Sequence, residues 1–299
     1  MRSLLAELQL VGARGEPVDL RRTLASHGVA SLPPQRLDEE AWTLETTLPT
    51  PRDARTIRVS ESAPGHAAVE AVDGAVRARD RTTLLVTVHH MLRLDDDLSR
   101  FYERAADDPD LAWVTKGAGR MLRSPTVFED VVKTICTTNC AWSGTVRMVS
   151  ALVDHLGAAA PDGRRAFPTP EAMAAAGDDF YRDVARAGYR GPYLRTLAEQ
   201  VAVGETDLEA LADPERPEDE VAAALLALPG VGPYAAAHIM TTSLGRYRRL
   251  IFDSWTRPTY ARLNGRKASD KTIERRFRRY GDYAGLAFWL YLTKGWVPA

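Results

Sequence analysis

The residues with the clearest chemical potential are a glycine-rich turn and one aspartate that follows it. The turn consists of Leu228, Pro229, Gly230, Val231 and Gly232. Its two glycines allow positive φ angles and leave the main chain open to a ligand. Backbone N–H groups exposed at the start of a helix would bind an anion such as a phosphate group. An ordinary tight turn between two helices is the alternative that the same residues allow.

Good helix formers lie on both sides of this turn. Residues 218–228 are rich in Ala, Leu and Glu and begin with acidic residues, which the helix dipole favours. Pro229 and Gly230 would end that helix, and Pro233 suits the first turn of a second helix over 234–244. The sequence therefore predicts two helices joined by a hairpin at 226–236.

Asp253 comes twenty-four residues after Pro229 and closes the short apolar run 250–252. The segment before that run, 245–249, is basic, and another helical stretch follows the aspartate. An acid in this position could simply cap the next helix. It could also be a carboxylate that the helix dipole keeps ionised and available for chemistry.

The charge of the chain is spread unevenly. The 299 residues carry a net charge of −1, which argues against a general polyanion binder. Residues 246–280 nevertheless hold twelve Arg and Lys against three acids, whereas residues 205–220 hold eight acids against one Arg. A cationic block around Asp253, beside an anion-binding turn, is typical of a nucleic-acid channel. A solvated helix face is the simpler alternative.

Together these motifs resemble the helix-hairpin-helix DNA glycosylase superfamily, and the resemblance covers roughly residues 110–299. Residues 125–139 are similar to the helix before the DNA-inserting loop of 8-oxoguanine DNA glycosylases, and 188–193 to their second DNA-facing turn. The tail, 290–298, is more similar to that of the bacterial 3-methyladenine DNA glycosylase II branch. The resemblance implies an α+β chain, in which a small antiparallel β domain precedes a mostly α-helical, two-subdomain core that carries the hairpin.

The resemblance also implies roles for single residues. Asp253 matches the catalytic acid, which stabilises positive charge on the sugar as the base departs and helps to position water. Tyr234 stands where bifunctional members place their Schiff-base lysine, and a phenol cannot form that imine. Asn139 matches the residue that fills the gap left by a flipped nucleotide, Tyr189 an aromatic wedge and Arg190 a contact to the estranged base. Each of these three could instead be a surface-loop or helix-cap residue.

A flipped base also needs a pocket. His238 lies one helical turn after Tyr234 and matches a position that lines the pocket in related enzymes, although a hydrogen-bonded core histidine is the more common case. The aromatic candidates for stacking on the base are Trp142, Phe288 and Trp289, and core packing is their alternative. The resemblance further implies a monovalent cation, Na⁺ or K⁺, at the carbonyls of Leu226, Leu228 and Val231.

These features predict a monofunctional DNA N-glycosylase of base excision repair that hydrolyses a damaged base, preferably an alkylated purine, out of duplex DNA. An 8-oxoguanine-type glycosylase and a non-catalytic hairpin protein that binds damaged DNA are the alternatives. Cys136 and Cys140 are expected to be buried and reduced, and no cysteine or histidine spacing suits an iron–sulfur cluster or zinc. We expect a cytoplasmic monomer, nucleoid-associated if bacterial, that requires no cofactor and does not bind membranes.

The predicted organisation is a β-rich domain over 1–108 and a helical core over 109–299. Runs of β-forming residues predict strands at 42–48, 56–59, 67–72 and 82–88. Helical patterns predict helices at 98–105, 125–138, 146–155, 170–175, 180–187 and 193–203.

Overall fold

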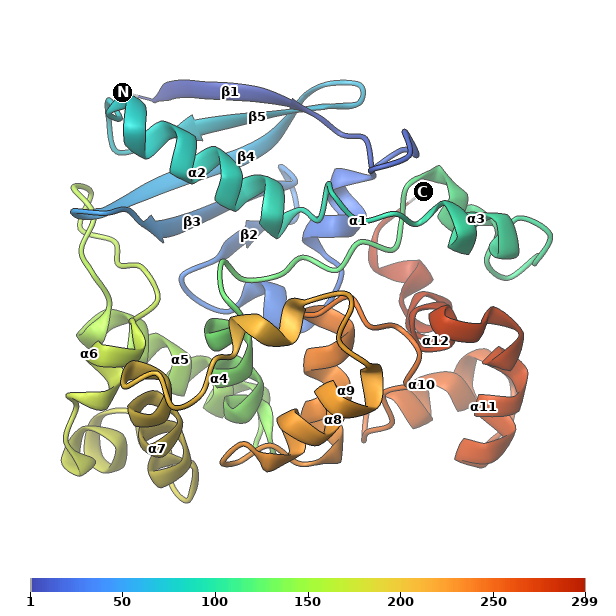
Figure 1. The fold of residues 1–299 in the computed structure, drawn as a ribbon. Helices are drawn as coiled ribbons and strands as arrows, with labels where there is room; N and C mark the ends of the chain where they lie inside the picture. Colours follow the sequence, from blue (N-terminus) through green and yellow to red (C-terminus); the bar gives the residue numbers. More distant parts are fainter. Residues whose placement is uncertain (1, 299) are drawn as a thin grey trace.

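The computed structural model describes residues 2–298, which form an antiparallel β-sheet followed by a large helical region (Figure 1). The strand order in the sheet is β1-β5-β4-β3-β2, and every neighbouring pair is antiparallel. The predicted α+β class is thus confirmed. The strands are β1 (Ser3–Gln9), β2 (Arg36–Asp38), β3 (Thr43–Pro49), β4 (Ala54–Ala63) and β5 (His66–Ala71).

One predicted strand is wrong, because residues 82–88 lie inside helix α2 (Ala78–Met91), which packs across the sheet in Figure 1. β-branched residues suggested a strand there. The buried side chains of α2 are instead Leu84, Val88 and Met91, which recur at helical spacing, while Val86 is 65% exposed. A strand would have placed Leu84, Val86 and Val88 on one face. Strands β1 and β2 were missing from the sequence prediction.

The helical region follows the predicted pattern, with shifted ends. The predicted helix at 180–187 is a single π-helical turn, and the one at 193–203 begins three residues earlier, at Arg190. No helix within residues 2–298 is both long and apolar enough to cross a membrane. The α-helices other than α2 are α1 (Leu20–Leu24), α3 (Ser99–Ala105), α4 (Val127–Thr137), α5 (Trp142–Leu156), α6 (Pro170–Ala174), α7 (Arg190–Ala202), α8 (Glu218–Ala227), α9 (Pro233–Thr242), α10 (Thr256–Leu263), α11 (Asp270–Phe277) and α12 (Ala284–Thr293).

Three main hydrophobic cores hold these elements together. The first lies between the sheet, α1 and α2. The second joins α4, α5, α7, α8 and α9, and the third joins α3 with α10, α11 and α12. Residues 98–121 pack in the third core with the C-terminal helices. The expected domain boundary at 108 therefore falls inside a core rather than between two cores.

Buried polar contacts join the N-terminal part of the chain to the helices. Arg93, 1% exposed, donates to the carbonyls of Met121 (2.7 Å), Thr242 (2.7 Å) and Ser243 (2.6 Å), and the last two lie at the C-terminal end of α9. Arg22 of α1 donates to two carbonyls near the C-terminus, those of Lys294 and Val297, both at 3.2 Å.

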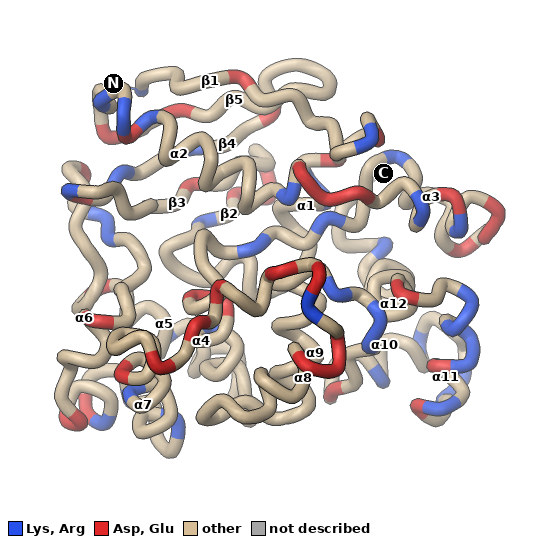
Figure 2. The backbone as a smooth tube through the Cα atoms, in the orientation of Figure 1, with Lys and Arg blue, Asp and Glu red and all other residues tan. Residues whose placement is uncertain are grey.

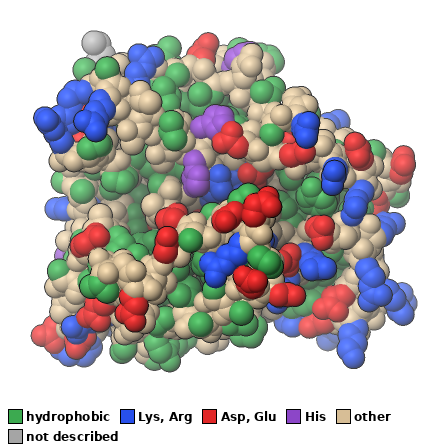
Figure 3. Space-filling model, in the orientation of Figure 1, with side chains coloured by type: hydrophobic (Ala, Val, Ile, Leu, Met, Phe, Trp, Pro, Cys, Tyr) green, Lys and Arg blue, Asp and Glu red, His purple; other side chains and the backbone are tan. Residues whose placement is uncertain are grey.

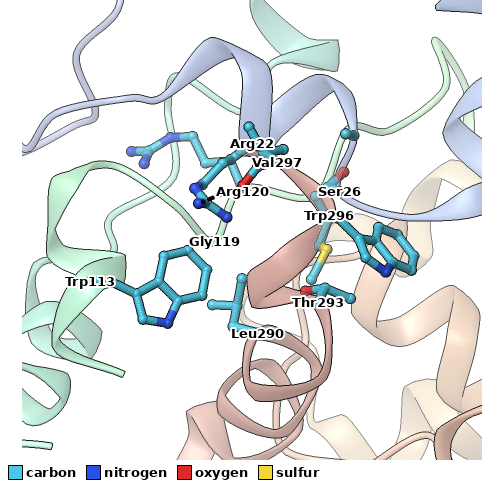
Figure 4. A pocket seen from close by; sticks show the side chains of 11 residues that line it. Arg22, Ser26, Trp113, Gly119, Arg120, Leu290, Thr293, Trp296 and Val297 are labelled. Atoms are coloured by element: carbon cyan, nitrogen blue, oxygen red, sulfur yellow. Dashed lines mark hydrogen bonds between the residues drawn. The ribbon is translucent and has the colours of Figure 1, made fainter. Parts of the chain in front are cut away.

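Arg22 also borders a small cavity between α1 and α12. Figure 4 shows Arg22, Trp113, Leu290 and Trp296 around it. The guanidinium lies 4.3 Å from the centre of the Trp113 ring, which makes this a tight cation–π contact. The cavity measures about 20 Å³, which suits one water molecule and no larger ligand.

Candidate active site

An open cleft of about 550 Å³ lies between the start of α9, the end of α4 and the segment before α10. Four stretches that are distant in sequence meet there, and they include the hairpin glycines, Asn139, Tyr189, Tyr234 and Asp253. The complete lining is Thr137, Thr138, Asn139, Cys140, Tyr189, Gly230, Gly232, Pro233, Tyr234, Ala235, Phe252, Asp253 and Ser254.

The hairpin between α8 and α9 forms where the sequence predicts it. Gly230 has φ of +77°, which favours glycine, and a Cβ there would lie 3.1 Å from Tyr193 Cβ. Gly232 precedes α9 in an extended conformation with open space around it, and Pro233 occupies the first turn. Within residues 2–298, the N–H groups of Gly230 and Gly232 donate to no backbone carbonyl. The hairpin therefore presents free donors at a helix N-terminus that borders the cleft.

Asp253 uses one carboxylate oxygen for structure and keeps the other available. Its Oδ1 accepts hydrogen bonds from the N–H groups of Trp255 (2.8 Å) and Thr256 (2.6 Å), at the start of α10. Its own N–H donates to Thr256 Oγ1 at 2.9 Å. Oδ2 takes part in no hydrogen bond or ion pair within the described chain, although the residue lines the cleft. The start of α10 thus fixes the position of the carboxylate.

Tyr234 stands on the first turn of α9 and also lines the cleft. Burial raises the pKa of its phenol, and the negative charge of Asp253 raises it further, whereas a hydrogen bond with Thr137 opposes the shift. The phenol therefore stays neutral near pH 7. It offers the cleft an aromatic face and a hydroxyl, but no amine.

The three residues expected to meet the DNA duplex form one cluster at the edge of the cleft. Asn139 Nδ2 donates to the hydroxyl of Tyr189 at 3.2 Å, and the Tyr189 side chain is 53% exposed. Arg190 differs from its expected role as a base contact because it is buried. It donates to the Thr138 carbonyl and lies 4.5 Å from the centre of the Tyr189 ring. In this structure Arg190 supports the Thr138–Asn139 segment and Tyr189 from behind.

None of the four expected pocket residues lines the cleft. His238 is buried behind Tyr234, and the two rings stack with centroids 5.9 Å apart. Phe288 is fully buried in the third core, and Trp289 donates from its indole N–H to the Ser26 carbonyl at 2.7 Å. Trp142 is 47% exposed at the start of α5. Core packing prevails for Phe288 and Trp289.

Phe252 and Ser254 flank Asp253 in the cleft and were missing from the sequence prediction, as were Thr137 and Thr138. Their closeness to predicted site residues was the only available signal. Cys140 corrects an expectation: it is exposed and lines the cleft, whereas Cys136 is buried as expected. Because α4 ends at Thr137, Cys140 lies in the loop beyond the helix rather than on its buried face.

No protein-family model and no curated protein sequence matches this chain. Solved structures do match it along almost its whole length. The 3-methyladenine DNA glycosylase of Archaeoglobus fulgidus aligns with a TM-score of 0.73 at 20% identity, over 98% of this chain and 100% of that one. The apo 8-oxoguanine glycosylase/lyase of Clostridium acetobutylicum gives 0.72 at 19% identity, over 98% of both chains. MBOgg1 bound to a low-affinity DNA ligand gives 0.74 at 19% identity, again over 98% of both.

The chain therefore has the fold of the helix-hairpin-helix DNA glycosylases, as its motifs led us to expect. Structures named for 3-methyladenine and for 8-oxoguanine both share this fold. Identities near one fifth establish the fold alone. The reaction must be argued from the cleft.

Proposed function

We propose that this protein is a monofunctional DNA N-glycosylase. The observation that carries the proposal is Asp253, whose anchored carboxylate has a free oxygen in a cleft that the anion-binding hairpin borders. The fold shared with DNA glycosylases supports the same reading. A non-catalytic DNA-binding protein would gain nothing from a free carboxylate beside a site that must hold phosphates.

The proposed reaction is hydrolysis of the bond between the damaged base and its sugar. The hairpin N–H groups hold a backbone phosphate and thereby place a flipped nucleotide in the cleft. As the base leaves, positive charge develops on the sugar, and the Asp253 carboxylate stabilises it and orients the attacking water. Tyr234 cannot form a Schiff base, so the product is an abasic site in an uncut strand.

The proposal includes a monovalent cation at the hairpin carbonyls of Leu226, Leu228 and Val231. The Leu228 carbonyl accepts from the Val231 N–H at 3.2 Å and has a second lone pair for a ligand. When bound, such an ion would add positive charge beside the phosphate. Without the ion, these carbonyls are only part of the backbone of the turn.

Alkylated purines are the proposed substrates. A cationic alkylated base is a good leaving group that needs no lysine, and the aromatic faces of Tyr234 and Phe252 suit a cation in the cleft. An 8-oxoguanine-type substrate is the second candidate. The pairing of Asn139 with Tyr189 at the edge of the cleft favours it, since these are the residues that resemble that branch.

A panel of labelled duplexes tests the reaction and its substrate. Each duplex carries one lesion: an alkylated purine, hypoxanthine, uracil or 8-oxoguanine. Strand cleavage that requires subsequent alkali supports hydrolysis alone, and cleavage without alkali contradicts it. The lesion removed fastest under single-turnover conditions identifies the preferred base, and removal of none would refute the proposed function.

Asp253→Asn tests the role of the carboxylate. Asn can still accept the capping hydrogen bonds from the start of α10, so the fold and DNA binding should persist. We expect single-turnover excision to fall by at least about 10²-fold, the usual loss when a charge-stabilising group is removed. Excision at the wild-type rate would refute the mechanism. An unchanged unfolding midpoint is the control for correct folding.

A further inference from the structure

A dense group of unpaired cations lies on one side of the cleft, on α10, α11 and the loop between them. Residues 256–279 hold nine Arg and Lys against two acids. Figure 2 shows these positive charges concentrated around α11. Eight of the nine are exposed. We give the name basic face to the five exposed ones that lie on α10, α11 or the loop between them and form no ion pair: Arg262, Arg266, Lys267, Lys271 and Arg275.

The basic face differs from the cations beside it because its members have no ion-pair partners. Arg257 pairs with Asp270 at 2.8 Å, and Arg276 pairs with Asp110 at 2.7 Å while it also bonds Tyr260 and Asn264. These contacts fix α10 and α11 against each other. The five members of the basic face form no ion pair or side-chain hydrogen bond with any described residue. Three of them, Arg266, Lys267 and Arg275, line a hollow of about 640 Å³.

The opposite side of the cleft, where Tyr189 stands, has no such excess. Residues 178–199 hold four arginines and four acids. Arg182 pairs with Asp179 and Asp183, and Arg195 pairs with Asp178 and Glu199. In Figure 1, α7 and α11 stand on opposite sides of α9, whose first turn borders the cleft. The charge around the cleft is therefore strongly one-sided.

Acidic side chains also limit where a polyanion can lie. The acids of residues 205–220 run across the front of the molecule between these two sides, and Figure 3 shows acidic side chains over the middle of that face. Arg249 is neutralised there by Glu218 and Asp219. A polyanion that enters the cleft will avoid this acidic segment and follow the basic face.

We propose that the basic face binds the phosphate backbone of the duplex on one side of the lesion only, which gives the enzyme an asymmetric DNA footprint. This inference rests on the proposed function, because it places a duplex in the cleft. Asp253 precedes α10, and this helix of eight residues extends about 12 Å toward the basic face. At 3.4 Å per base pair, contacts on that side would begin roughly four base pairs from the lesion.

Two duplexes of the same length and base composition test the asymmetry. In one, an abasic-site analogue lies about three base pairs from the 5′ end of its strand, and in the other about three from the 3′ end. The analogue is not excised, so binding is measured apart from catalysis. Wild-type protein should bind one of the two duplexes at least about tenfold more weakly, because the basic face then has no phosphates within reach. Equal affinities would overturn the proposal.

A triple variant links the asymmetry to the named residues. Arg266→Ser, Lys267→Ser and Arg275→Ser together should equalise the two affinities. They should also reduce the slope of log K against log salt by up to about 2.7 for a long duplex. The matched control removes three exposed, unpaired arginines from the sheet side of the molecule, Arg52→Ser, Arg79→Ser and Arg81→Ser. This control should change neither measurement.

The outcomes separate the two proposals. If the triple variant keeps both the wild-type asymmetry and the wild-type salt slope, the basic face does not bind DNA, and an acidic protein becomes its better partner. If the asymmetry and its loss are observed but no lesion in the panel is excised, the footprint stands and the proposed glycosylase activity fails. If excision occurs without asymmetry, only the footprint is refuted.

Discussion

At the scale of single residues, the chemistry depends on two neighbours that perform different tasks. Asp253 is held by backbone N–H groups at the start of α10 and keeps one oxygen free. Tyr234 is held on α9, and burial together with the charge of Asp253 raises the pKa of its phenol. One group stabilises positive charge and the other stays neutral. Replacing the neutral group with an amine should therefore change the type of reaction.

Tyr234→Lys should add lyase chemistry to the proposed hydrolysis. Partial burial lowers the pKa of a lysine, which increases the fraction of nucleophilic, uncharged amine at neutral pH. With a duplex that carries an excised or abasic site, borohydride should trap a covalent protein–DNA adduct with the variant only. Tyr234→Phe is the matched control, since it keeps the ring and has no amine. An adduct with wild-type protein would show that another amine reaches the sugar.

At the scale of elements, the two hairpin positions require glycine for different physical reasons. Gly230 has a positive φ and almost touches Tyr193, so the fold itself requires glycine at this position. Gly232 has an ordinary extended conformation and no atom near the position of a Cβ. The requirement for glycine at position 232 must therefore come from a ligand that approaches the hairpin.

Alanine at each glycine should separate folding from binding. Gly230→Ala should lower the free energy of unfolding by about 1–2 kcal/mol, because of its left-handed backbone and the crowding against Tyr193. Gly232→Ala should change it by less than about 0.5 kcal/mol and yet weaken DNA binding, since its Cβ would meet the phosphate. Urea unfolding and DNA titrations measure the two effects. Unchanged DNA affinity in Gly232→Ala would argue against phosphate contact at the hairpin.

The sequence predicted the local parts of this site well and the distant contacts poorly. The hairpin and the start of α9 follow from glycine and proline at fixed positions, so they needed no tertiary information. Arg190 illustrates the opposite case. Its burial depends on the Thr138 carbonyl, fifty-two residues away, which no local pattern reveals. In α2, β-branched residues misled the prediction, because tertiary burial of Leu84 and Val88 outweighs local preference.

At the scale of the whole molecule, the N-terminal part of the chain supports α9 from behind the cleft. His27, in the segment after α1, lies edge-on to His238 of α9 with centroids 5.9 Å apart. Burial lowers the pKa of His27 to about 4. The hydrogen bond to the Leu122 carbonyl opposes this shift, and the nearby positive charges of Arg93 and Lys133 add to it. Burial and the adjacent His27 lower the pKa of His238 to about 3. Both rings are neutral in the folded protein at pH 7.

This histidine pair predicts a loss of stability in mild acid. Unfolded histidine gains a proton near pH 6.5, whereas the folded rings resist it down to about pH 4 and 3. Below pH 6.5 the unfolded chain binds protons that the folded rings do not, so the free energy of unfolding is highest above pH 6.5 and falls as the pH decreases. Each histidine should lower the free energy of unfolding by about 2 kcal/mol at pH 5, relative to its value well above pH 6.5. Urea unfolding at pH 7 and 5 should show a smaller loss for His238→Phe than for wild type or the surface control His155→Gln. Equal losses in all three would contradict this assignment.

Arg93 gives the clearest mechanical link between the two parts of the chain. One guanidinium holds the Met121 carbonyl and the last carbonyls of α9, at the end opposite to the hairpin. Arg93→Lys keeps the charge, but its single nitrogen cannot replace both Nε, which bonds the Met121 carbonyl, and Nη2, which bonds the two α9 carbonyls, so at least one buried carbonyl loses its partner. We expect the free energy of unfolding to fall by about 2–4 kcal/mol.

The same substitution should also reach the cleft. Since α9 carries Tyr234 on its first turn and directly follows the hairpin, a looser C-terminal end lets that turn move relative to Asp253. Excision should therefore slow in Arg93→Lys even under conditions where the variant is fully folded. Single-turnover rates at low temperature, compared with an equally destabilising core variant such as Leu84→Ala under the sheet, measure this effect. If both variants excise at the wild-type rate when folded, Arg93 contributes to stability alone and α9 holds its position without it.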